Sequence, residues 1–330
     1  MPSRNRHVIA VVVLVPVLAA LALWAFAWPA SRIAPRDLPL GVAGPAAAAA
    51  QVERQLEGHE GAFEIHRYAD EAAARDAIED RSVYGAVVVT AQGPELLTAS
   101  AAGPAVAQFL QQAVAHQATT EGAQVKTVDV VSTPAGDPRG AVLNAATLPL
   151  ALAGIAAGAV VTLLGLRGFR AVTALLGASA LVGVVAAGIA HSWLGALGGD
   201  WWTEASVLGL STLAVGGAVA GLAALIGPAG TGVAAALVML IGNPFSGATS
   251  APQMLPEPAG AIGQWLPPGA GTTLLRSVSY FDGAAATGPA LTLAWWAVLG
   301  LGAVLLGGSL RARKASGGPA AERRELSAVA

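Results

Sequence analysis

Residues 232–258 read "GVAAALVMLIGNPFSGATSAPQMLPEP". A run without any charge stops at Asn243-Pro244 and gives way to a Pro/Gly-rich segment whose one ionisable residue is Glu257. Such a passage is typical of a turn at a membrane boundary, because irregular backbone inside the hydrocarbon must be satisfied by protein or water. The run is short for a membrane span of about 20 residues. Whether it crosses decides on which side of the membrane the end of the chain lies.

Composition agrees with a membrane location. The chain has 330 residues, of which 55% are hydrophobic and 12% charged, whereas about a quarter of the residues are charged in an ordinary soluble domain. The net charge of −2 lacks the basic field of a nucleic-acid binder. The absence of cysteine excludes disulfides, thiol nucleophiles and Cys-based zinc sites. We therefore expect the lipid bilayer as a partner and no nucleic acid.

The first apolar segment is long enough to cross a bilayer. It runs from Val8 to Trp28 and is preceded by Arg4 and Arg6, and at about 1.5 Å per residue it spans a hydrocarbon core of about 30 Å. The small-x-small sequence at residues 25–27 also fits a signal-peptidase site, although a signal h-region has only about 7–15 apolar residues. The first helix is thus a retained anchor or a cleaved signal.

Residues 31–139 hold most of the acidic residues and predict a folded domain that faces water. Their patterning predicts strands and helices in alternation, which indicates a small α/β domain with a partly parallel sheet. The expected strands are 38–44, 63–68, 84–90 and 126–132, and the expected helices are 70–80 and 105–118. The histidines of this region, at 59, 66 and 116, have no metal-ligand spacing.

Five further apolar blocks follow this domain, and with the first helix they predict six transmembrane helices. The blocks are Val142–Leu166, Ala171–Ala190, Ser206–Ile226, Thr231–Ile241 and Gly288–Gly308. Six crossings place the basic groups at 4–6, 167–170 and 311–314 on one side, which the positive-inside rule makes the cytoplasm. All eight tryptophans then map to the outer boundary or the outer half.

The predicted fold is therefore an α-helical polytopic membrane protein with six transmembrane helices and an extracytoplasmic α/β domain inserted between helices 1 and 2. Both termini are expected in the cytoplasm, and the location is the plasma membrane. The domain boundaries are 1–30 for the N-terminus and anchor, 31–139 for the α/β domain, 140–310 for the membrane domain with an outer segment at 243–287, and 311–330 for a disordered tail.

The sequence lacks the motifs of ion-coupled transport, of ATP binding and of catalysis. The interiors of the apolar blocks contain no ionisable residue, which argues against a self-powered secondary transporter. No G-x-x-x-x-G-K-[ST] loop is present, so the chain lacks a Walker-type ATP site. The carboxylates expected in outer loops, Asp200, Glu204, Glu257 and Asp282, have no nucleophile pattern beside them. The sequence predicts neither enzyme activity nor a catalytic, metal or cofactor site.

Two glycine pairs predict close packing between membrane helices. Gly154 and Gly158, and likewise Gly217 and Gly221, are four residues apart and share a helix face. Small residues at this spacing let helix backbones approach closely in lipid. We expect a tightly packed bundle, and these pairs support a homodimer only weakly.

The order of segments resembles a known family. One anchor helix, an outer domain opening with "LPLGVAG" (38–44) and five spans with a long outer excursion resemble the ABC-2-type permease superfamily. The passages "DEAAARDAIEDRSVYGAVVV" (70–89), "NPFSGATSAPQMLP" (243–256) and "WLPPGAGTTLLRSVSYFDG" (265–283) carry the likeness. Within that superfamily, the chain resembles most the branch that includes the group of the YhgE/phage infection protein.

This resemblance implies the membrane subunit of an export system for a hydrophobic or amphiphilic compound. It further implies a dimer and a separate cytoplasmic subunit that binds ATP. The chain departs from such permeases at residues 166–170, where the connection is too short for a coupling helix. The alternative function is an envelope scaffold or receptor that acts through its extracytoplasmic domain.

The prolines of the 243–287 segment fix φ and remove backbone donors, so this segment is expected to form short helices at 259–266 and 272–281. It is either a structural cap or an outer gate. We expect Leu274 and Phe281 to face apolar surroundings, and Arg276 to point toward water or headgroups near Asp282. The gate candidates are Asn243, Pro244, Ser246, Gly247, Pro256, Trp265, Pro267, Arg276, Tyr280 and Asp282.

Overall fold

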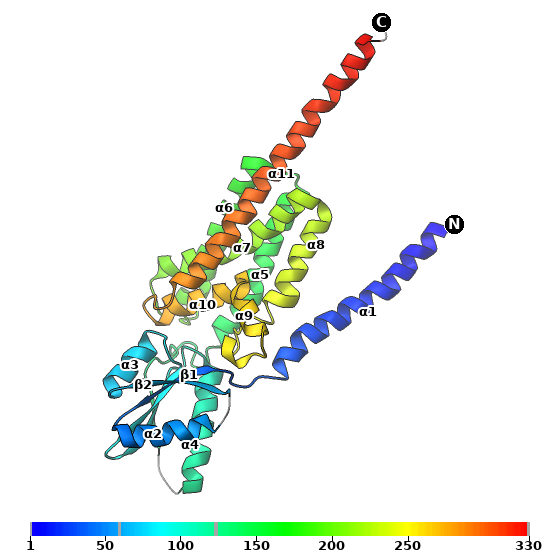
Figure 1. The fold of residues 1–330 in the computed structure, drawn as a ribbon. Coiled ribbons are helices and arrows are strands. Elements are labelled where there is room, and N and C mark those ends of the chain that lie inside the picture. Colours follow the sequence, from blue (N-terminus) through cyan, green and yellow to red (C-terminus); the bar gives the residue numbers. More distant parts are fainter. Residues whose placement is uncertain (1, 59–60, 122–124, 329–330) are drawn as a thin grey trace.

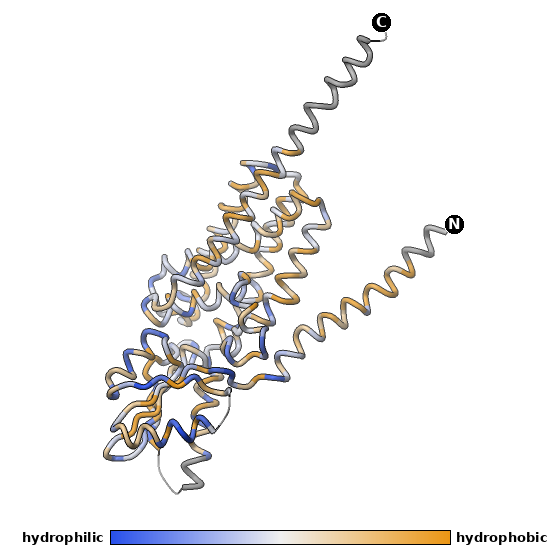
Figure 2. The backbone as a smooth tube through the Cα atoms, viewed as in Figure 1, coloured by the Kyte–Doolittle hydropathy of each residue, from blue (hydrophilic) through white to orange (hydrophobic). Residues whose placement is uncertain are grey.

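The computed structural model describes residues 2–58, 61–121 and 125–328. A small sheet flanked by helices lies at one end of a bundle of long helices (Figure 1). Helix α1 (Pro2–Ala30) and helix α11 (Thr287–Ala328) both carry their chain terminus away from the sheet. The bundle helices and α1 are mostly apolar along their length, whereas hydrophilic residues gather on the sheet region (Figure 2).

The sheet has five described strands in the spatial order β2-β1-β3-β4-β5. Strand β1 runs parallel to β2 and β3, β4 is antiparallel to β3, and β5 is parallel to β4. Their bounds are β1 Leu38–Ala43, β2 Phe63–Tyr68, β3 Gly85–Thr90, β4 Gly93–Thr98 and β5 Lys126–Asp129. A partly parallel sheet is what the alternation of strands and helices predicts.

Helices cover both faces of this sheet. Leu38 and Leu40 of β1 pack on the face that holds Leu110 of α4 (Pro104–Glu121). Ala43 lies on the opposite face with Ile78 of α3 (Glu71–Glu79). Because both of its faces are buried, β1 has an almost continuous apolar sequence instead of an alternating one.

Two elements of this region are not predicted from sequence. Helix α2 (Ala46–Glu57) begins after Pro45, whose side chain makes no capping hydrogen bond, so the usual start signal is missing. Strand β4 contains Pro94 and Glu95 and does not alternate. Helix α3, in contrast, starts as predicted at Asp70, whose carboxylate accepts a hydrogen bond from the amide of Ala73 at 2.9 Å.

Five described helices are long and apolar enough to cross a membrane: α1, α5 (Ala141–Leu163), α6 (Gly168–Ala187) with its π-helical turn η1 (Gly188–Trp193), α7 (Trp201–Ile226) and α11. Helix α7 is central and packs against α5, α6 and α11. In its most apolar window 56% of the residues are buried, compared with 28% in each of those three partners.

Glycines bring the backbone of α7 close to its neighbours. A Cβ atom at Gly158 of α5 would lie 2.6 Å from the carbonyl oxygen of Gly216, and one at Gly154 would lie 2.7 Å from Cβ of Val215. On the other side of α7, a Cβ at Gly221 would lie 2.6 Å from the carbonyl oxygen of Gly300 in α11. A Cβ at Gly217 would make ordinary contacts of 3.6 Å or more.

The sixth apolar segment is shorter. It comprises α8 (Pro228–Ala236) and the π-helical turn η2 (Leu237–Gly242), with 9 and 6 residues respectively. At 1.5 Å per residue it reaches about 22 Å, less than the hydrocarbon thickness of about 30 Å. It begins three residues earlier than the apolar block at 231–241, because only Gly227, with φ +82°, separates it from α7.

The two terminal helices differ from the bundle. Helix α1 is apart from the other spans over most of its length (Figure 1), and only 6% of its apolar window is buried. It contacts η2, and its residue Trp28 stacks on Trp24 and meets the ring of Phe245 edge-on at 6.0 Å. Helix α11 has 42 residues and continues to Ala328, through the segment for which the sequence predicts disorder.

Candidate functional site

The Pro/Gly-rich segment forms a layer between the sheet and the bundle. It contains a 3₁₀ turn, η3 (Pro252–Met254), and two helices, α9 (Ala259–Gln264) and α10 (Pro267–Tyr280). On the sheet side, the hydroxyl of Tyr84 donates to Oε1 of Gln253 at 2.9 Å. Met254 is buried in the cluster that contains Leu38 and Leu40. The sheet core is therefore completed by residues from the second half of the chain.

Side-chain and backbone contacts fold the first part of this layer. The hydroxyl of Ser246 donates to the carbonyl oxygen of Asn243 at 2.7 Å. The amide of Gln264 donates to the carbonyl oxygen of Ser246 at 3.0 Å. Gly247 has φ +69°, and a Cβ atom there would lie 2.7 Å from the nitrogen of Pro252. Only glycine fits this turn, because both its backbone conformation and its surroundings exclude a side chain.

Helix α10 is buried between the sheet and the bundle. Leu274 and Leu275 belong to the apolar cluster of the bundle, whereas Phe281, just after the helix, belongs to a cluster of the sheet. Arg276 is only 3% exposed, and its Nη2 donates to the carbonyl oxygen of Ala248 at 3.1 Å. The expectation that Arg276 points to water or headgroups is therefore wrong, because α10 has protein on both sides. Asp282 is exposed and forms no described ion pair with it.

A second arginine connects the sheet region to α10. Nη1 of Arg81 donates to the carbonyl oxygen of Thr273 at 3.1 Å and to the hydroxyl of Ser277. Its guanidinium carbon lies 5.2 Å from the ring centre of Phe281. Burial lowers the pKa of Arg81 to about 10, and the neighbouring charge of Arg276 acts in the same direction. Two cations are thus held at this junction by carbonyl, hydroxyl and aromatic groups.

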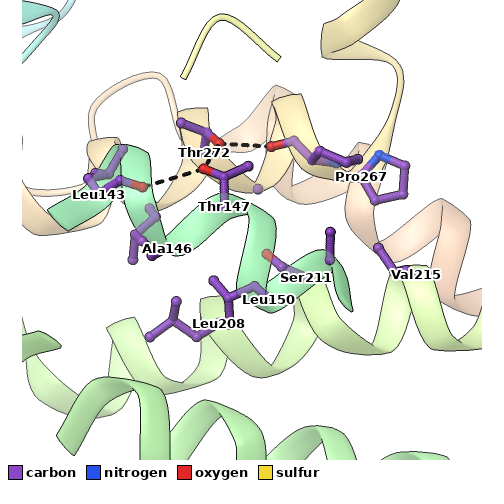
Figure 3. Close-up of a pocket in the computed structure, with 13 residues that line it drawn as sticks. Leu143, Ala146, Thr147, Leu150, Leu208, Ser211, Val215, Pro267 and Thr272 are labelled. Atoms are coloured by element: carbon purple, nitrogen blue, oxygen red, sulfur yellow. Dashed lines mark hydrogen bonds between the residues drawn. The ribbon is translucent and has the colours of Figure 1, made fainter. Parts of the chain in front are cut away.

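A small pocket with three hydroxyl groups lies where α5, α7 and α10 meet (Figure 3). Its volume is about 30 Å³. The hydroxyls of Thr147 and Thr272 lie 3.3 Å apart, and that of Thr272 also donates to the carbonyl oxygen of Pro268 at 2.8 Å. Ser211 of α7 adds the third hydroxyl, which donates to the carbonyl oxygen of Val207 at 2.8 Å. A cavity of this size accepts one small polar group.

An apolar cleft adjoins this pocket. Its volume is about 570 Å³, and α5, α6 and the segment after η1 form its walls. Every described residue that lines it is Val, Leu, Ile, Ala or Pro. Volume and lining both fall in the range of small-molecule sites, for which about 300–1,000 Å³ is usual.

An ionisable pair of half-buried His191 and buried Glu204 holds the connection between η1 and α7. Glu204 is fully buried, and its Oε2 lies 2.7 Å from Nδ1 of His191. Its Oε1 accepts a hydrogen bond from the amide of Gly199 at 2.9 Å. The connection is also fixed by Tyr280, whose hydroxyl donates to the carbonyl oxygen of Ala196 at 2.7 Å.

This pair corrects one expectation. Glu204 is not in a solvated outer loop, because α7 is capped by Asp200 and starts at Trp201, five residues before the apolar block at 206–226. The helical turn η1 likewise takes in His191, just beyond the block at 171–190. Two of the helices long enough to span a membrane thus contain an ionisable residue near their ends. The capping pattern at Asp200 is the sequence signal that predicts the earlier start.

The structure distributes the ten gate candidates unevenly. Five are buried, namely Ser246, Gly247, Pro256, Pro267 and Arg276. Asn243, Pro244 and Tyr280 are half-buried, and Trp265 and Asp282 are exposed. Of the ten, Pro267 lines the hydroxyl pocket. The pocket hydroxyls themselves are not among the candidates, although Thr147 and Ser211 each stand inside an apolar block, where a hydroxyl side chain is a signal that the sequence shows.

Within the described residues, no group of three or more His, Cys, Asp or Glu side chains is placed to hold a metal ion. The structure offers instead a buried layer, a hydroxyl pocket and an apolar cleft at the sheet end of the bundle.

Comparison with known proteins gives one match. Residues 6–166 match the family model described as ABC-2 family transporter protein. Searches of curated proteins and of solved structures gave no significant match. The matched part covers most of α1, the sheet region and α5. With this match and its five apolar helices, the chain is a multi-pass membrane protein whose first half is similar to ABC-2 family transporter proteins.

Proposed function

We propose that the chain is the permease subunit of an ABC transporter and exports a hydrophobic or amphiphilic compound. The match over residues 6–166 carries this proposal. The apolar cleft supports it, because a hydrophobic cargo can enter such a cleft sideways from lipid. The sequence has no Walker loop, so ATP hydrolysis is assigned to a separate cytoplasmic subunit.

The proposed topology has six crossings, with both termini in the cytoplasm and the sheet region outside. It is supported by the direction of α1 and α11, which both carry their termini away from the sheet. The α5–α6 turn contains Arg167, and Arg311 follows the last apolar stretch, so basic residues gather at the end proposed to face the cytoplasm. The short segment α8–η2 is the sixth crossing in this proposal.

In this arrangement the 243–287 segment is the outer gate. It separates the bundle from the sheet region and contains buried polar contacts that a sliding motion would break, such as the bond from Arg276 to Ala248. The cleft and the hydroxyl pocket lie directly beneath it, since Pro267 and Thr272 of α10 line the pocket. Opening of this layer would give cargo a path to the outer surface.

The topology is tested by single-cysteine labelling. The chain contains no cysteine, so each introduced thiol is the only one. Gln51→Cys is placed on the exposed side of α2 and Ser316→Cys beyond the last apolar stretch. In sealed inside-out vesicles, a membrane-impermeant maleimide is expected to label Ser316→Cys and to leave Gln51→Cys unlabelled. Equal labelling of both would contradict the six-span proposal.

Export is tested with the full-length chain purified in mild detergent. A nucleotide-binding subunit in stoichiometric amount, and ATP-dependent transport after both are reconstituted, are expected. A stable chain without such a partner, combined with unchanged efflux in a deletion strain, would reject the permease proposal.

One observation favours a second function, that of an envelope scaffold or receptor. Only residues 164–167 separate α5 from α6, and only Gly227 separates α7 from α8. Neither connection has room for a helix that could transmit movement from an ATPase. The scaffold function predicts that a partner binds the sheet region. It must be tested in the full chain, because Ala251 and Met254 complete the core of the sheet region.

A further inference from the structure

The apolar cleft and the hydroxyl pocket are parts of one cavity system. Five residues line both of them: Leu143, Ala146, Leu150, Leu208 and Leu275. The cleft is apolar and has a volume of about 570 Å³, and the hydroxyl pocket adjoins it with a volume of about 30 Å³. A ligand that fills both therefore needs an apolar body and one small polar end.

The polar end offers hydrogen-bond acceptors. The hydroxyl of Thr272 donates its proton to Pro268, and that of Ser211 donates to Val207. Each oxygen then keeps lone pairs for a ligand. Thr147 lies beside them, with its hydroxyl 3.4 Å from the carbonyl oxygen of Leu143. The pocket is thus complementary to a group that donates hydrogen bonds.

Two more acceptors lie on α5, one from a residue that lines the cleft and one from the neighbouring Asn144, which lines neither the cleft nor the pocket. Pro149 has no N–H, so it cannot satisfy the carbonyl oxygen of Ala145, and both residues line the cleft. Oδ1 of Asn144, in the same turn, is buried and has no hydrogen-bond partner among the described residues. An acceptor left unpaired in an apolar region is costly unless a ligand or water completes it.

The lack of charged side chains in the cavity disfavours amphiphiles with a charged headgroup. Among the described residues, no Asp, Glu, Lys, Arg or His lines the cleft or the pocket. A phosphate, carboxylate or quaternary ammonium headgroup would lose its hydration there without gaining a counter-charge. A hydroxyl or primary amide headgroup loses less hydration free energy on entering the pocket, and it can donate hydrogen bonds to the hydroxyl oxygens there.

We propose that this cavity binds a single-chain amphiphile whose head is uncharged and donates hydrogen bonds. Its chain lies in the cleft between α5 and α6, and its head lies between Thr147, Ser211 and Thr272. This proposal rests on the proposed function, for which it names the cargo class and the binding site.

The experiment uses the full-length protein in lipid nanodiscs and three photoreactive probes. The probes are a diazirine-bearing long-chain alcohol and the carboxylate and quaternary ammonium of the same chain length. After irradiation, the labelled peptides are identified by mass spectrometry. The alcohol is expected to label peptides from α5 and α6 strongly, and an excess of the unmodified alcohol is expected to prevent this labelling. The two charged probes are expected to label them weakly.

Two variants test the site itself. Ala153→Phe fills the cleft, because Ala153 lines it, and is expected to abolish the specific labelling. Ala156→Phe adds the same side chain to an exposed position of α5 outside the cleft and serves as the matched control. The double variant Thr147→Val/Thr272→Val keeps the shape of the pocket and removes two of its hydroxyls. It is expected to weaken the binding of the alcohol probe about two- to tenfold.

Equal labelling by the three probes, or labelling that persists in Ala153→Phe, would overturn the proposal and identify the cleft as ordinary lipid-facing surface. Because the assay measures binding without ATP, its result is separate from export. Specific binding without ATP-driven transport would reject only the permease function. Transport with unchanged labelling in both variants would reject only this site.

Discussion

The packing of α7 against α11 gives the sharpest test of the bundle. Gly300 of α11 lies against the backbone of α7, and a Cβ atom there would be 2.6 Å from the carbonyl oxygen of Gly217 and 2.7 Å from the nitrogen of Ala218. Both neighbours are backbone atoms and cannot rotate away. Gly300→Ala therefore forces the two helices apart, and such overpacking costs about 1–3 kcal/mol.

A second glycine of the same helix is the control. Gly302 is exposed, and a Cβ atom there would have no neighbour within 4 Å. Each substitution raises the intrinsic helix propensity by the same amount, which corresponds to about 1 kcal/mol of folding free energy. The difference between Gly300→Ala and Gly302→Ala therefore isolates the steric term of about 1–3 kcal/mol.

Thermal unfolding in detergent or nanodiscs, followed through the fluorescence of the eight tryptophans, measures this difference. One kcal/mol shifts the melting temperature by about 2–4 °C in chains of about 150–250 residues, so Gly300→Ala is expected to melt about 2–12 °C below Gly302→Ala. Equal melting temperatures would show that the two backbones do not approach as described.

Three further predictions concern buried or capping charges. Arg276→Met removes a buried cation that has one described hydrogen bond, so the melting temperature is expected to stay unchanged or rise; a marked fall would contradict this. Glu204→Ala is expected to lower the melting temperature more than Glu204→Gln, because the amide of Gln still accepts from the buried backbone N–H. Hydrogen bonds from Thr203 hold the pKa of Asp200 below its ordinary value. The stability they give is present above pH about 4 and is lost as the pH falls through the lowered pKa. The protection factor of the Thr203 amide, which is the intrinsic exchange rate at a given pH divided by the observed rate, should therefore fall only in acid, and Asp200→Asn should abolish that fall.

Local signals were sufficient for part of the sheet region. The apolar run at 38–44, the alternation at 63–68 and the cap at Asp70 each predict an element that the structure contains. Each of these signals acts within a few residues of the chain. The region as a whole is less local, since Met254 supplies part of its core from a distant segment. No sequence pattern indicates that contact.

Helix α10 shows why periodicity alone misplaced Arg276. Its apolar residues predict one buried face and one face toward water. The structure covers both sides, because Leu275 meets the bundle and Phe281 meets the sheet region. A helix between two folded parts has no solvent face, and its polar residues must find partners in protein. For Arg276 that partner is the carbonyl group of Ala248.

The same helix links the two halves of the proposed mechanism. Thr273 and Ser277 of α10 accept hydrogen bonds from Arg81 of the sheet region, whereas the adjacent residue Thr272 meets Thr147 in the hydroxyl pocket. A helical segment this short moves as a rigid unit, because each of its turns is closed by backbone hydrogen bonds. A shift of the sheet region that moves Arg81 would therefore act on Thr273, which is adjacent to Thr272 of the hydroxyl pocket. Under the proposed transport cycle, we expect opening of the outer layer to be coupled in this way to the site for the polar head.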